Sequence, residues 1–276
     1  MLIHEKYNAL KIHLASLKSV AVAFSGGVDS TLLLKIAHDV LGTNAIAVTV
    51  SSSFIAKREI QEAKAFCSEH GITQEVITVD EAEIPYFTEN PPDRCYLCKR
   101  EIFTKILETA RNHNIAHVLD GSNVDDLGDY RPGLKALQEL RIKSPLREYG
   151  FTKAEVRELS RELGLPTWEK PSFACLASRF AYWEKITPEK LEMVERAEGL
   201  LQRLGFRQMR VRLHGKTARI EILPEEFSRI VQEDIRTKIC DTFKGLGFSY
   251  VTLDLMGYRT GSMNVPLRTL SINREP

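Results

Sequence analysis

The chain has 276 residues, of which 43% are hydrophobic and 27% charged, and its net charge is +1. This composition is typical of a soluble globular protein and excludes a disordered or fibrous chain. The small net charge argues against a broad basic surface for nucleic acid, and no stretch approaches the roughly 18 apolar residues that span a bilayer. We therefore expect a cytoplasmic protein of two domains, with no membrane or nucleic-acid partner.

Strand and helix patterns alternate over the first part of the chain. Residues 4–18 show helical spacing, and an apolar run ending at Phe24 is followed by a Gly-Gly turn and a helix that ends at Gly42. We then expect strands at 45–50, 75–80 and 117–121 and helices at 56–71, 99–113 and 152–163. The alternation predicts an α/β fold whose parallel sheet is covered by helices and binds ligands at the carboxyl ends of its strands.

The pattern changes after about residue 185. It predicts, in order, a helix at 188–204, strands at 209–213 and 217–222, a helix at 225–244 and a strand at 248–254. These elements form a smaller C-terminal α+β domain. We place the boundary so that the domains span residues 1–184 and 185–276, and we expect the second to bind substrate and to form a homo-oligomer.

A glycine-containing loop, SGGVDST, joins the first strand to its helix. Gly26 and Gly27 can take backbone angles closed to other residues and let main-chain N–H groups approach an anion, and the helix N-terminus adds unpaired donors. Ser25 and Ser30 supply hydroxyl groups, and Asp29 can hold Mg²⁺. The loop lacks the lysine of a Walker A loop and the three glycines of a dinucleotide fold. A plain turn with helix-capping side chains is the alternative.

The loop resembles the PP-loop, Ser-Gly-Gly-x-Asp-Ser, of the ATP pyrophosphatase superfamily. This resemblance implies an adenine nucleotide alpha hydrolase-like fold, ATP and Mg²⁺ as cofactors, and transfer of AMP to an acceptor oxygen with release of pyrophosphate. It assigns Ser25, Gly26, Gly27, Asp29 and Ser30 to the ATP site. Because AMP is a good leaving group, adenylation prepares a carbon for attack by nitrogen or sulfur.

A second polar segment, LDGSNVDDLGDYRPG at 119–133, follows the fourth expected strand. Its Gly121, Asn123 and Asp126 are predicted to face the same strand ends as the PP-loop and to contribute to the ATP site. A polar loop whose carboxylates only cap a turn is the alternative.

The chain has five cysteines, an odd number that favours thiols, metal ligands or catalytic groups over a disulfide framework. Cys67 and Cys240 lie at apolar positions of expected helices and are predicted to be small core residues. Cys95 and Cys98 form a Cys-x-x-Cys pair in PPDRCYLCKR, and Cys175 lies in KPSFACLASRF. We expect the loops that carry these three to emerge at the ligand-binding end of the sheet, where they can meet.

Three thiolates can hold a [4Fe–4S] cluster, which is usually held by four cysteines, and leave one iron open to a ligand such as hydrosulfide. A structural zinc ion is an alternative, but it takes four ligands. No second Cys-x-x-Cys or His pair completes that set of four, although His70, His113 or His117 can still supply a ligand. Unconnected or redox-active thiols are the third alternative.

Nearly the whole chain resembles the LarE family, PP-loop sulfur transferases that act in making the nickel-pincer nucleotide cofactor of lactate racemase. The motifs that carry the resemblance are VAFSGGVDSTLLLK, VLDGSNVDDLGDYRPGLKAL, VRLHGKTARIEI and LGFSYVTLDLMGYRTGSMN. The family implies that ATP adenylates a carboxylate of pyridinium-3,5-biscarboxylic acid mononucleotide and that sulfur then displaces AMP, giving a thiocarboxylate.

Members of this family differ in their cysteines. Some have a single cysteine at the position of Cys175 and give up its sulfur, leaving dehydroalanine. A chain with Cys95, Cys98 and Cys175 resembles the subset that is ascribed a [4Fe–4S] cluster. We therefore expect the cluster to carry a sulfide that is transferred to the substrate. Free sulfide or another sulfur donor then reloads the cluster between turnovers.

The expected hairpin of the second domain carries a pair of arginines. Strand alternation puts Arg210 and Arg212 on one face, and guanidinium groups bind phosphate in a bidentate manner. The family comparison implies that this pair holds the substrate phosphate, with Ser178, Arg179 and Glu198 as further candidates. A solvated strand face is the alternative.

Three other functions fit parts of the sequence. A PP-loop tRNA thiolase can also pair Cys-x-x-Cys with a third cysteine, but the chain is nearly neutral and shows no added RNA-binding module. A carboxylate amidase of the NAD or GMP synthetase type would use ammonia in place of sulfur. A non-catalytic nucleotide sensor would need neither the cysteines nor turnover of ATP.

Overall fold

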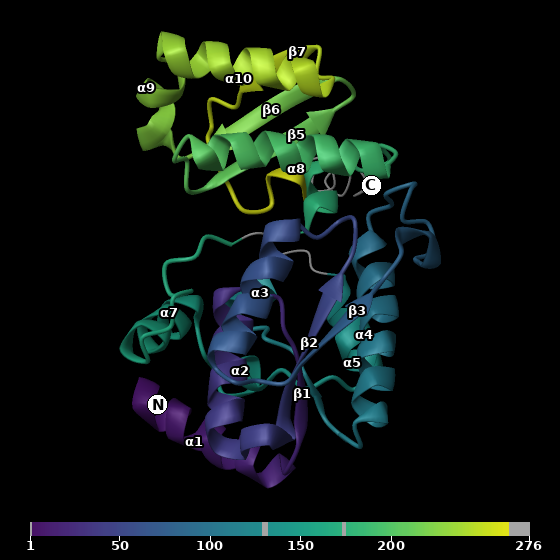
Figure 1. Ribbon diagram of the computed structural model, residues 1–276, viewed down its shortest axis with the longest axis vertical. Coiled ribbons are helices and arrows are strands. Elements are labelled where there is room, and N and C mark those ends of the chain that lie inside the picture. Colours follow the sequence, from purple (N-terminus) through teal and green to yellow (C-terminus); the bar gives the residue numbers. More distant parts are fainter. Residues whose placement is uncertain (1, 129–131, 173–174, 265–276) are drawn as a thin grey trace, which may run out of the picture. The chain divides into compact units, whose positions relative to one another are not determined.

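The computed structural model describes residues 2–128, 132–172 and 175–264 (Figure 1). The chain divides into two compact units: residues 2–85 with 93–172 form the first, and residues 86–92 with 175–264 form the second. The division into functional domains at residues 184 and 185 remains a prediction.

The sheet of the first unit has four parallel strands in the order β3-β2-β1-β4. In the central pairings Ala21 of β1 lies opposite Ile46 of β2 and Val118 of β4. The predicted α/β fold is therefore confirmed. The strands are β1 Val20–Ala23, β2 Ala45–Ser51, β3 Gln74–Thr78 and β4 Val118–Leu119.

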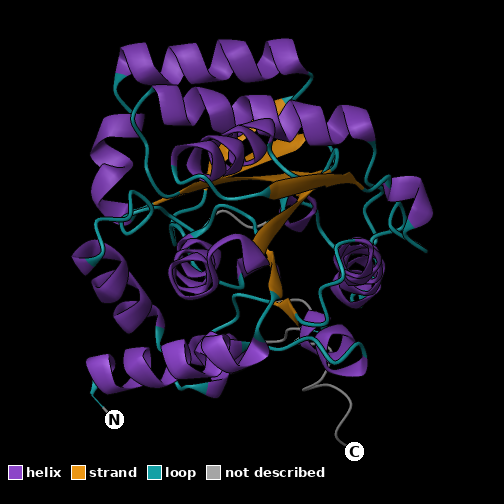
Figure 2. Ribbon diagram, turned by 60° about the horizontal axis from the view of Figure 1, so that its bottom comes forward, coloured by secondary structure: helices purple, strands orange, loops and turns teal. Residues whose placement is uncertain are grey.

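Helices cover both faces of this sheet, as Figure 2 shows. Because successive side chains of a strand point to opposite faces, Val20 and Val22 pack in a core with α1, α2, α3 and α7, whereas Ala21 packs in a second core with α4 and α5. The helices are α1 Ile3–Leu17, α2 Val28–Leu41, α3 Lys57–Glu69, α4 Arg94–Asn112, α5 Gly133–Glu139, α6 Pro145–Glu148 and α7 Lys153–Glu162.

The second unit contains a mixed three-stranded sheet in the order β5-β6-β7. Strands β5 and β6 form an antiparallel hairpin, whose turn contains Gly215 at a φ of +59°, and β6 and β7 are parallel. The smaller α+β unit is thus confirmed. Its elements are α8 Pro188–Arg203, β5 Met209–His214, β6 Thr217–Ile222, α9 Phe227–Ile230, α10 Glu233–Leu246 and β7 Tyr250–Leu253.

Two predicted helices were wrong in their bounds. Helix α4 begins at Arg94, five residues before the expected start, because the carbonyl of Asp93 accepts hydrogen bonds from the N–H groups of Tyr96 and Leu97. The expected helix 225–244 is interrupted: Gln232 is extended, with a ψ of 141°, and α10 begins after it. Acidic residues in the first turn of α10 favour this new N-terminus.

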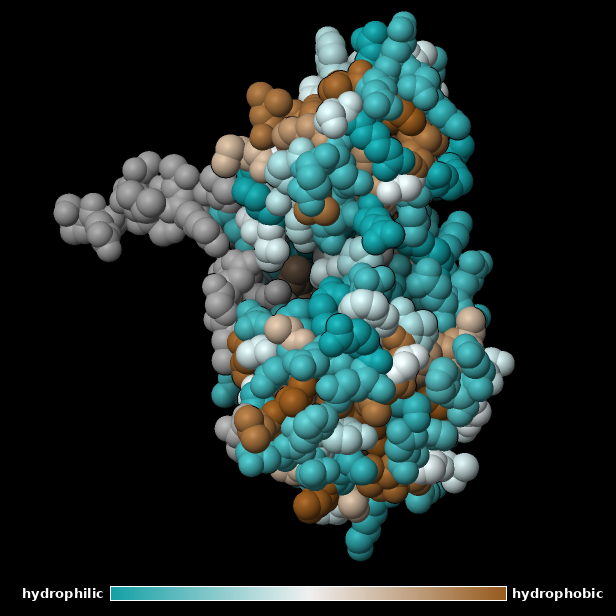
Figure 3. Space-filling model, turned by 90° about the vertical axis from the view of Figure 1, so that its left-hand side faces the viewer, coloured by the Kyte–Doolittle hydropathy of each residue, from teal (hydrophilic) through white to brown (hydrophobic). Residues whose placement is uncertain are grey.

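The surface of the molecule is mixed in character. On the face drawn in Figure 3, hydrophilic and hydrophobic residues are interspersed. Within the part of the chain that the structure describes, none of the helices combines the length and the apolar character needed to cross a membrane.

Candidate active site

The PP-loop connects the carboxyl end of β1 to the first turn of α2. Gly26 has a φ of +68°, in the left-handed region that favours glycine, and Gly27 precedes the first helical residue. The Ser25 N–H donates to Ser30 Oγ at 3.3 Å, and the Ser30 hydroxyl donates to the Gly27 carbonyl at 3.2 Å. Ser30 thus joins the start of the loop, at Ser25, to Gly27 through hydrogen bonds.

The second polar segment lies directly against this loop. A Cβ atom added to Gly121 would be 2.9 Å from the main-chain nitrogen of Ser30 and 3.1 Å from its Cα. Gly121 therefore permits a close backbone approach that a residue with a side chain would prevent. The structure brings the two sequence segments together at the same strand ends.

Asp29 is the centre of a polar cluster beside the loop. Asn123 Nδ2 donates to Asp29 Oδ1 at 2.8 Å, and Lys153 Nζ forms an ion pair with Asp29 Oδ2. Asp126 Oδ2 accepts from the Asn123 N–H at 3.0 Å, and Asp125 Oδ2 accepts from the Lys153 N–H at 2.6 Å. Asp126 thus has the capping contact that was its alternative role, and its part in ATP binding remains a prediction.

Two lysines that the sequence analysis did not select contact the loop region. Lys153 is the first residue of α7, and Thr152 and Glu155 around it form a capping box. The Thr-x-x-Glu pattern of this capping box is visible in the sequence. It marks where α7 begins and would have identified Lys153 as the first residue of the helix. Lys170 Nζ donates to the Gly26 carbonyl at 3.0 Å, a contact with no local signal in the sequence.

Cys95 and Cys98 lie in the first two turns of α4, not in the loop that we expected. Because they are three residues apart on a helix, their side chains share one face. Neither forms a disulfide, and Arg94 Nη2 donates to Cys95 Sγ at 3.5 Å. The Cys-x-x-Cys pair is therefore on a regular element next to a cationic donor.

Cys175 belongs to the second unit, where it is exposed and directly precedes the 3-10 turn Leu176–Arg179. Among the side chains that the structure describes, no three His, Cys, Asp or Glu residues are grouped to hold a metal ion. The meeting of Cys95, Cys98 and Cys175 remains a prediction.

The other two cysteines occupy the positions that their helical spacing predicted. Cys67 of α3 is buried, and burial raises the pKa of its thiol to about 12. Such a thiol is almost entirely protonated at neutral pH and unreactive. Cys240 of α10 is partly buried.

A buried ion pair in the second unit joins two of the predicted substrate residues. Arg179 Nε and Nη2 donate to the two carboxylate oxygens of Glu198 at 2.8 and 2.9 Å. Burial by itself raises the pKa of Glu198, but the charge and hydrogen bonds of Arg179 lower it below its ordinary value. Arg179 Nη1 also donates to the Cys175 carbonyl at 3.1 Å and to Ser178 Oγ at 2.9 Å, so the pair fixes the main chain of Cys175.

Arg210 and Arg212 of β5 are both buried, with exposed fractions of 3% and 6%. The alternative of a solvated strand face is therefore wrong. The residues between β7 and Asn264 cover this face: the Arg210 guanidinium lies 5.1 Å from the ring centre of Tyr258, and Arg212 Nη2 donates to Ser262 Oγ at 3.1 Å. Burial and the charge of Arg179 lower the pKa of Arg210 to about 10.

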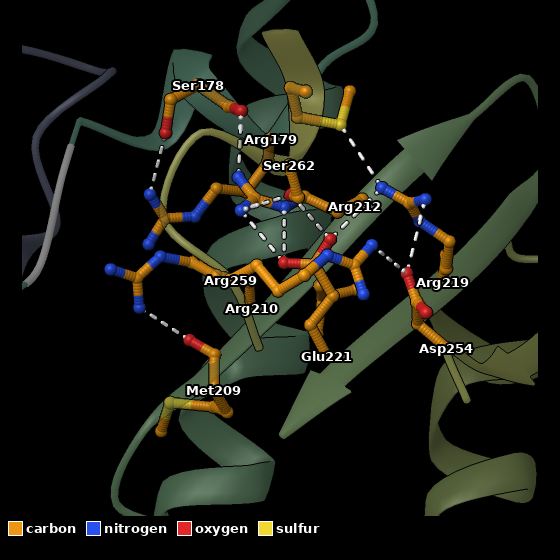
Figure 4. A network of polar contacts seen from close by, with 12 residues as sticks. Ser178, Arg179, Met209, Arg210, Arg212, Arg219, Glu221, Asp254, Arg259 and Ser262 are labelled. Atoms are coloured by element: carbon orange, nitrogen blue, oxygen red, sulfur yellow. Dashed lines mark hydrogen bonds and ion pairs between the residues drawn. The ribbon is translucent and has the colours of Figure 1, made fainter. Parts of the chain in front are cut away.

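Glu221 of β6 connects Arg212 to Arg219 (Figure 4). This fully buried carboxylate accepts from Arg212 Nε at 3.0 Å and from Arg212 Nη2 at 2.9 Å. It also accepts from Arg219 Nη2 at 3.0 Å and from the Ser262 hydroxyl at 2.7 Å. Strand alternation alone does not predict this network.

Comparison with known proteins identifies the family. The model of the NAD synthase family matches residues 4–105. A pyridinium-3,5-bisthiocarboxylic acid mononucleotide synthase of Lactiplantibacillus plantarum is 42% identical over 91% of this chain and 91% of its own length. The chain belongs to the LarE family. The predicted family is thus confirmed, and this LarE chain is an ATP-dependent enzyme of the PP-loop type.

Other relatives of this LarE chain differ in how much of it they match. An uncharacterized protein of Synechocystis sp. is 44% identical over 95% of the chain and 98% of its own length. A glutamine-hydrolyzing GMP synthase chain of Saccharolobus islandicus is 30% identical over 67% of the chain and 54% of its own length. The similarity to LarE-type relatives thus extends through both units.

Proposed function

We propose that this LarE chain is a sulfur transferase that adenylates a carboxylate of pyridinium-3,5-biscarboxylic acid mononucleotide and replaces AMP by sulfur. The observation that carries the proposal is its 42% identity, over 91% of the chain, to a synthase named for the bisthiocarboxylic product. The organisation of the PP-loop supports the ATP-dependent half of the reaction.

In the first half-reaction, the triphosphate lies on the PP-loop, where the N-terminus of α2 offers main-chain N–H donors. Asp29 would hold Mg²⁺: a carboxylate has about four lone-pair sites, and the contacts to Asn123 and Lys153 occupy one on each oxygen. A carboxylate oxygen of the substrate attacks the α-phosphorus of ATP, and pyrophosphate leaves. The product is an acyl adenylate.

The phosphate of the substrate binds at the arginines of the second unit. Arg179, Arg210 and Arg212 carry three positive charges against the two of Glu198 and Glu221, and the lowered pKa of Arg210 reflects the cost of burying its charge near other cations. An anion beside Arg210 would offset that cost through charge-assisted hydrogen bonds. Ser178, whose Oγ already contacts Arg179, is a further ligand.

Cys95, Cys98 and Cys175 would hold a [4Fe–4S] cluster as the source of sulfur. The thiols on one face of α4 and the exposed Cys175 suit such a donor set. When bound, the cluster would supply a transferable sulfide. Sulfur attacks the acyl carbon of the adenylate, and AMP leaves with the bonding electron pair. We also propose that the enzyme is a cytoplasmic homo-oligomer.

The direct test of this function is turnover with the pyridinium mononucleotide, ATP and Mg²⁺ under anaerobic conditions. We expect AMP and pyrophosphate in equal amounts and a product in which one oxygen is replaced by sulfur. Asp29→Asn should reduce AMP formation by two orders of magnitude, in line with loss of a metal-held phosphate contact of about 3 kcal/mol. AMP formation that depends on ammonium and not on sulfide would instead indicate an amidase.

The cluster is tested by anaerobic reconstitution with iron and sulfide. Cys95→Ala, Cys98→Ala and Cys175→Ala should each lose the broad absorbance at about 400 nm that Cys-ligated clusters give, and Cys240→Ala is the matched control. Retention of the absorbance by any of the three variants would reject the ligand set. Intact mass after turnover separates the two sulfur sources, because sacrifice of Cys175 removes about 34 Da as H₂S.

A further inference from the structure

Lys170 contacts the PP-loop but is not among the residues predicted to bind ATP. Its Nζ lies 3.0 Å from the Gly26 carbonyl oxygen, 2.8 Å from Glu59 Oε2 and 2.6 Å from Glu62 Oε2. The ammonium group donates hydrogen bonds to the Gly26 carbonyl and to Glu62, and it forms an ion pair with Glu59. The side chain is 12% exposed, and its position is therefore set by the protein rather than by solvent.

The main chain of Lys170 is fixed to helix α7. Arg157 Nη2 donates to the Lys170 carbonyl at 2.8 Å, and Arg157 Nη1 donates to the carbonyl of Trp168. The guanidinium of Arg161 lies 5.8 Å from the ring centre of Trp168. Helix α7 also carries Lys153, which pairs with Asp29. Helix α7 and the segment fixed to it thus place two lysines against the PP-loop region.

The bond from Lys170 determines how the peptide between Gly26 and Gly27 is oriented. In a trans peptide the carbonyl oxygen and the following N–H point in opposite directions. Gly26 lacks the side chain that would restrict its φ and ψ, so its own geometry does not fix this peptide. With the carbonyl held by Lys170, the Gly27 N–H points away from Lys170.

We propose that Lys170 is a positioning residue of the PP-loop, which holds the Gly26 carbonyl outside the loop and so turns the Gly27 N–H toward the triphosphate. The inference rests on the placement of the triphosphate proposed above. Lys170 also forms ion pairs with Glu59 and Glu62 and so reduces the repulsion between these carboxylates and the anionic triphosphate. It acts through the loop and makes no contact with the nucleotide.

The test compares Lys170→Met with Lys170→Arg and a matched lysine variant, Lys105→Met. Lys105 of α4 likewise contacts a carbonyl, that of Thr78 at 3.3 Å, and a carboxylate, that of Glu83. Loss of a hydrogen bond to a charged group costs about 1.5–3 kcal/mol, which corresponds to roughly a ten- to hundredfold change in affinity. Two quantities are measured: KM and kcat for ATP in AMP formation, and the rise in melting temperature that ATP and Mg²⁺ produce without the second substrate.

We expect Lys170→Met to raise KM for ATP at least tenfold, to change kcat less than about threefold and to abolish the melting-temperature rise at ATP concentrations that saturate the parent. Lys170→Arg should recover most of the affinity, and Lys105→Met should match the parent protein. If Lys170→Met does not fold, Lys170→Gln replaces it in the test. We expect this variant to raise KM for ATP at least about fivefold.

An unchanged KM in Lys170→Met, or a loss confined to kcat, would overturn the inference. So would an equal effect of Lys105→Met. Absence of the melting-temperature rise in the parent protein would instead refute the placement of the triphosphate. The two failures are thus distinguishable.

Discussion

Substituting alanine for Gly121 tests the close approach between the PP-loop and the second polar segment. The added Cβ would lie 2.9 Å from Ser30 N, 3.1 Å from Ser30 Cα and 3.3 Å from the Asp29 carbonyl carbon. Favourable contacts of a carbon atom begin at about 3.5 Å, so the helix start and the segment must separate by about half an ångström. Every atom in the clash belongs to the backbone, and no side-chain rotation relieves it.

The expected change in the free energy of unfolding is the sum of two opposing effects. Overpacking of this kind costs about 1–3 kcal/mol. Gly121 is not in the left-handed region, so alanine also restricts the unfolded chain and recovers about 0.4–1 kcal/mol. We expect Gly121→Ala to lower the free energy of unfolding by about 1–2 kcal/mol and, because the shift moves Ser30 and Asp29, to raise KM for ATP.

Urea unfolding at neutral pH and steady-state AMP formation measure the two effects. The matched control is Gly245→Ala in α10, where an added Cβ meets no heavy atom within 4 Å. There the higher helix propensity of alanine should stabilise the protein by about 0.5–1 kcal/mol. A Gly121→Ala variant with parental stability and parental KM would show that the two segments do not approach as described.

Two further predictions concern the ionisation of buried groups. Glu198→Gln should lower the free energy of unfolding at pH 7 by about 3–5 kcal/mol, because it leaves the Arg179 charge buried without its partner, whereas Glu192→Gln, at an exposed position of the same helix, should have little effect. Since the pKa of Glu198 is lowered in the folded protein, this contribution is fully present above its ordinary pKa of 4.5, begins to fall below that pH and is lost as the pH passes through the lower pKa of the folded state. Denaturation curves at pH 7 and about pH 3 with the same difference between parent and variant would contradict the assignment. Iodoacetamide at pH 8 should label Cys95 and leave Cys67 unmodified in the folded protein, because the Cys67 thiol is buried and has a pKa of about 12; peptide mass spectrometry checks this, and rapid labelling of Cys67 would refute its burial.

Local patterns predicted the fold because apolar periodicity and glycine stops are properties of short segments. The strands at 45–50 and 75–80 and the helix end at Gly42 depend on such signals, and the structure places these elements close to where they were expected. The start of α4 was missed because Pro91, Pro92 and the cysteine pair resemble a loop in composition. The bounds of a helix depend on capping contacts that composition does not specify.

The candidate site was less predictable, because its contacts join residues far apart in the chain. Lys170 and Gly26 are separated by 144 positions, and Lys153 and Asp29 by 124. The strand pattern of Arg210 and Arg212 is the same whether the arginines face water or a buried carboxylate. Only the tertiary structure shows that Glu221 accepts hydrogen bonds from that side.

The hydrogen bond from Arg179 to the Cys175 carbonyl bears on how Cys175 can move during a catalytic cycle. The peptide carbonyl of Cys175 is held by a guanidinium that is itself locked by Glu198, while the residue is exposed. The main chain at Cys175 is therefore held in place by a buried ion pair. Under the sulfur transfer proposed above, an anchored Cys175 requires the activated substrate to be delivered to it.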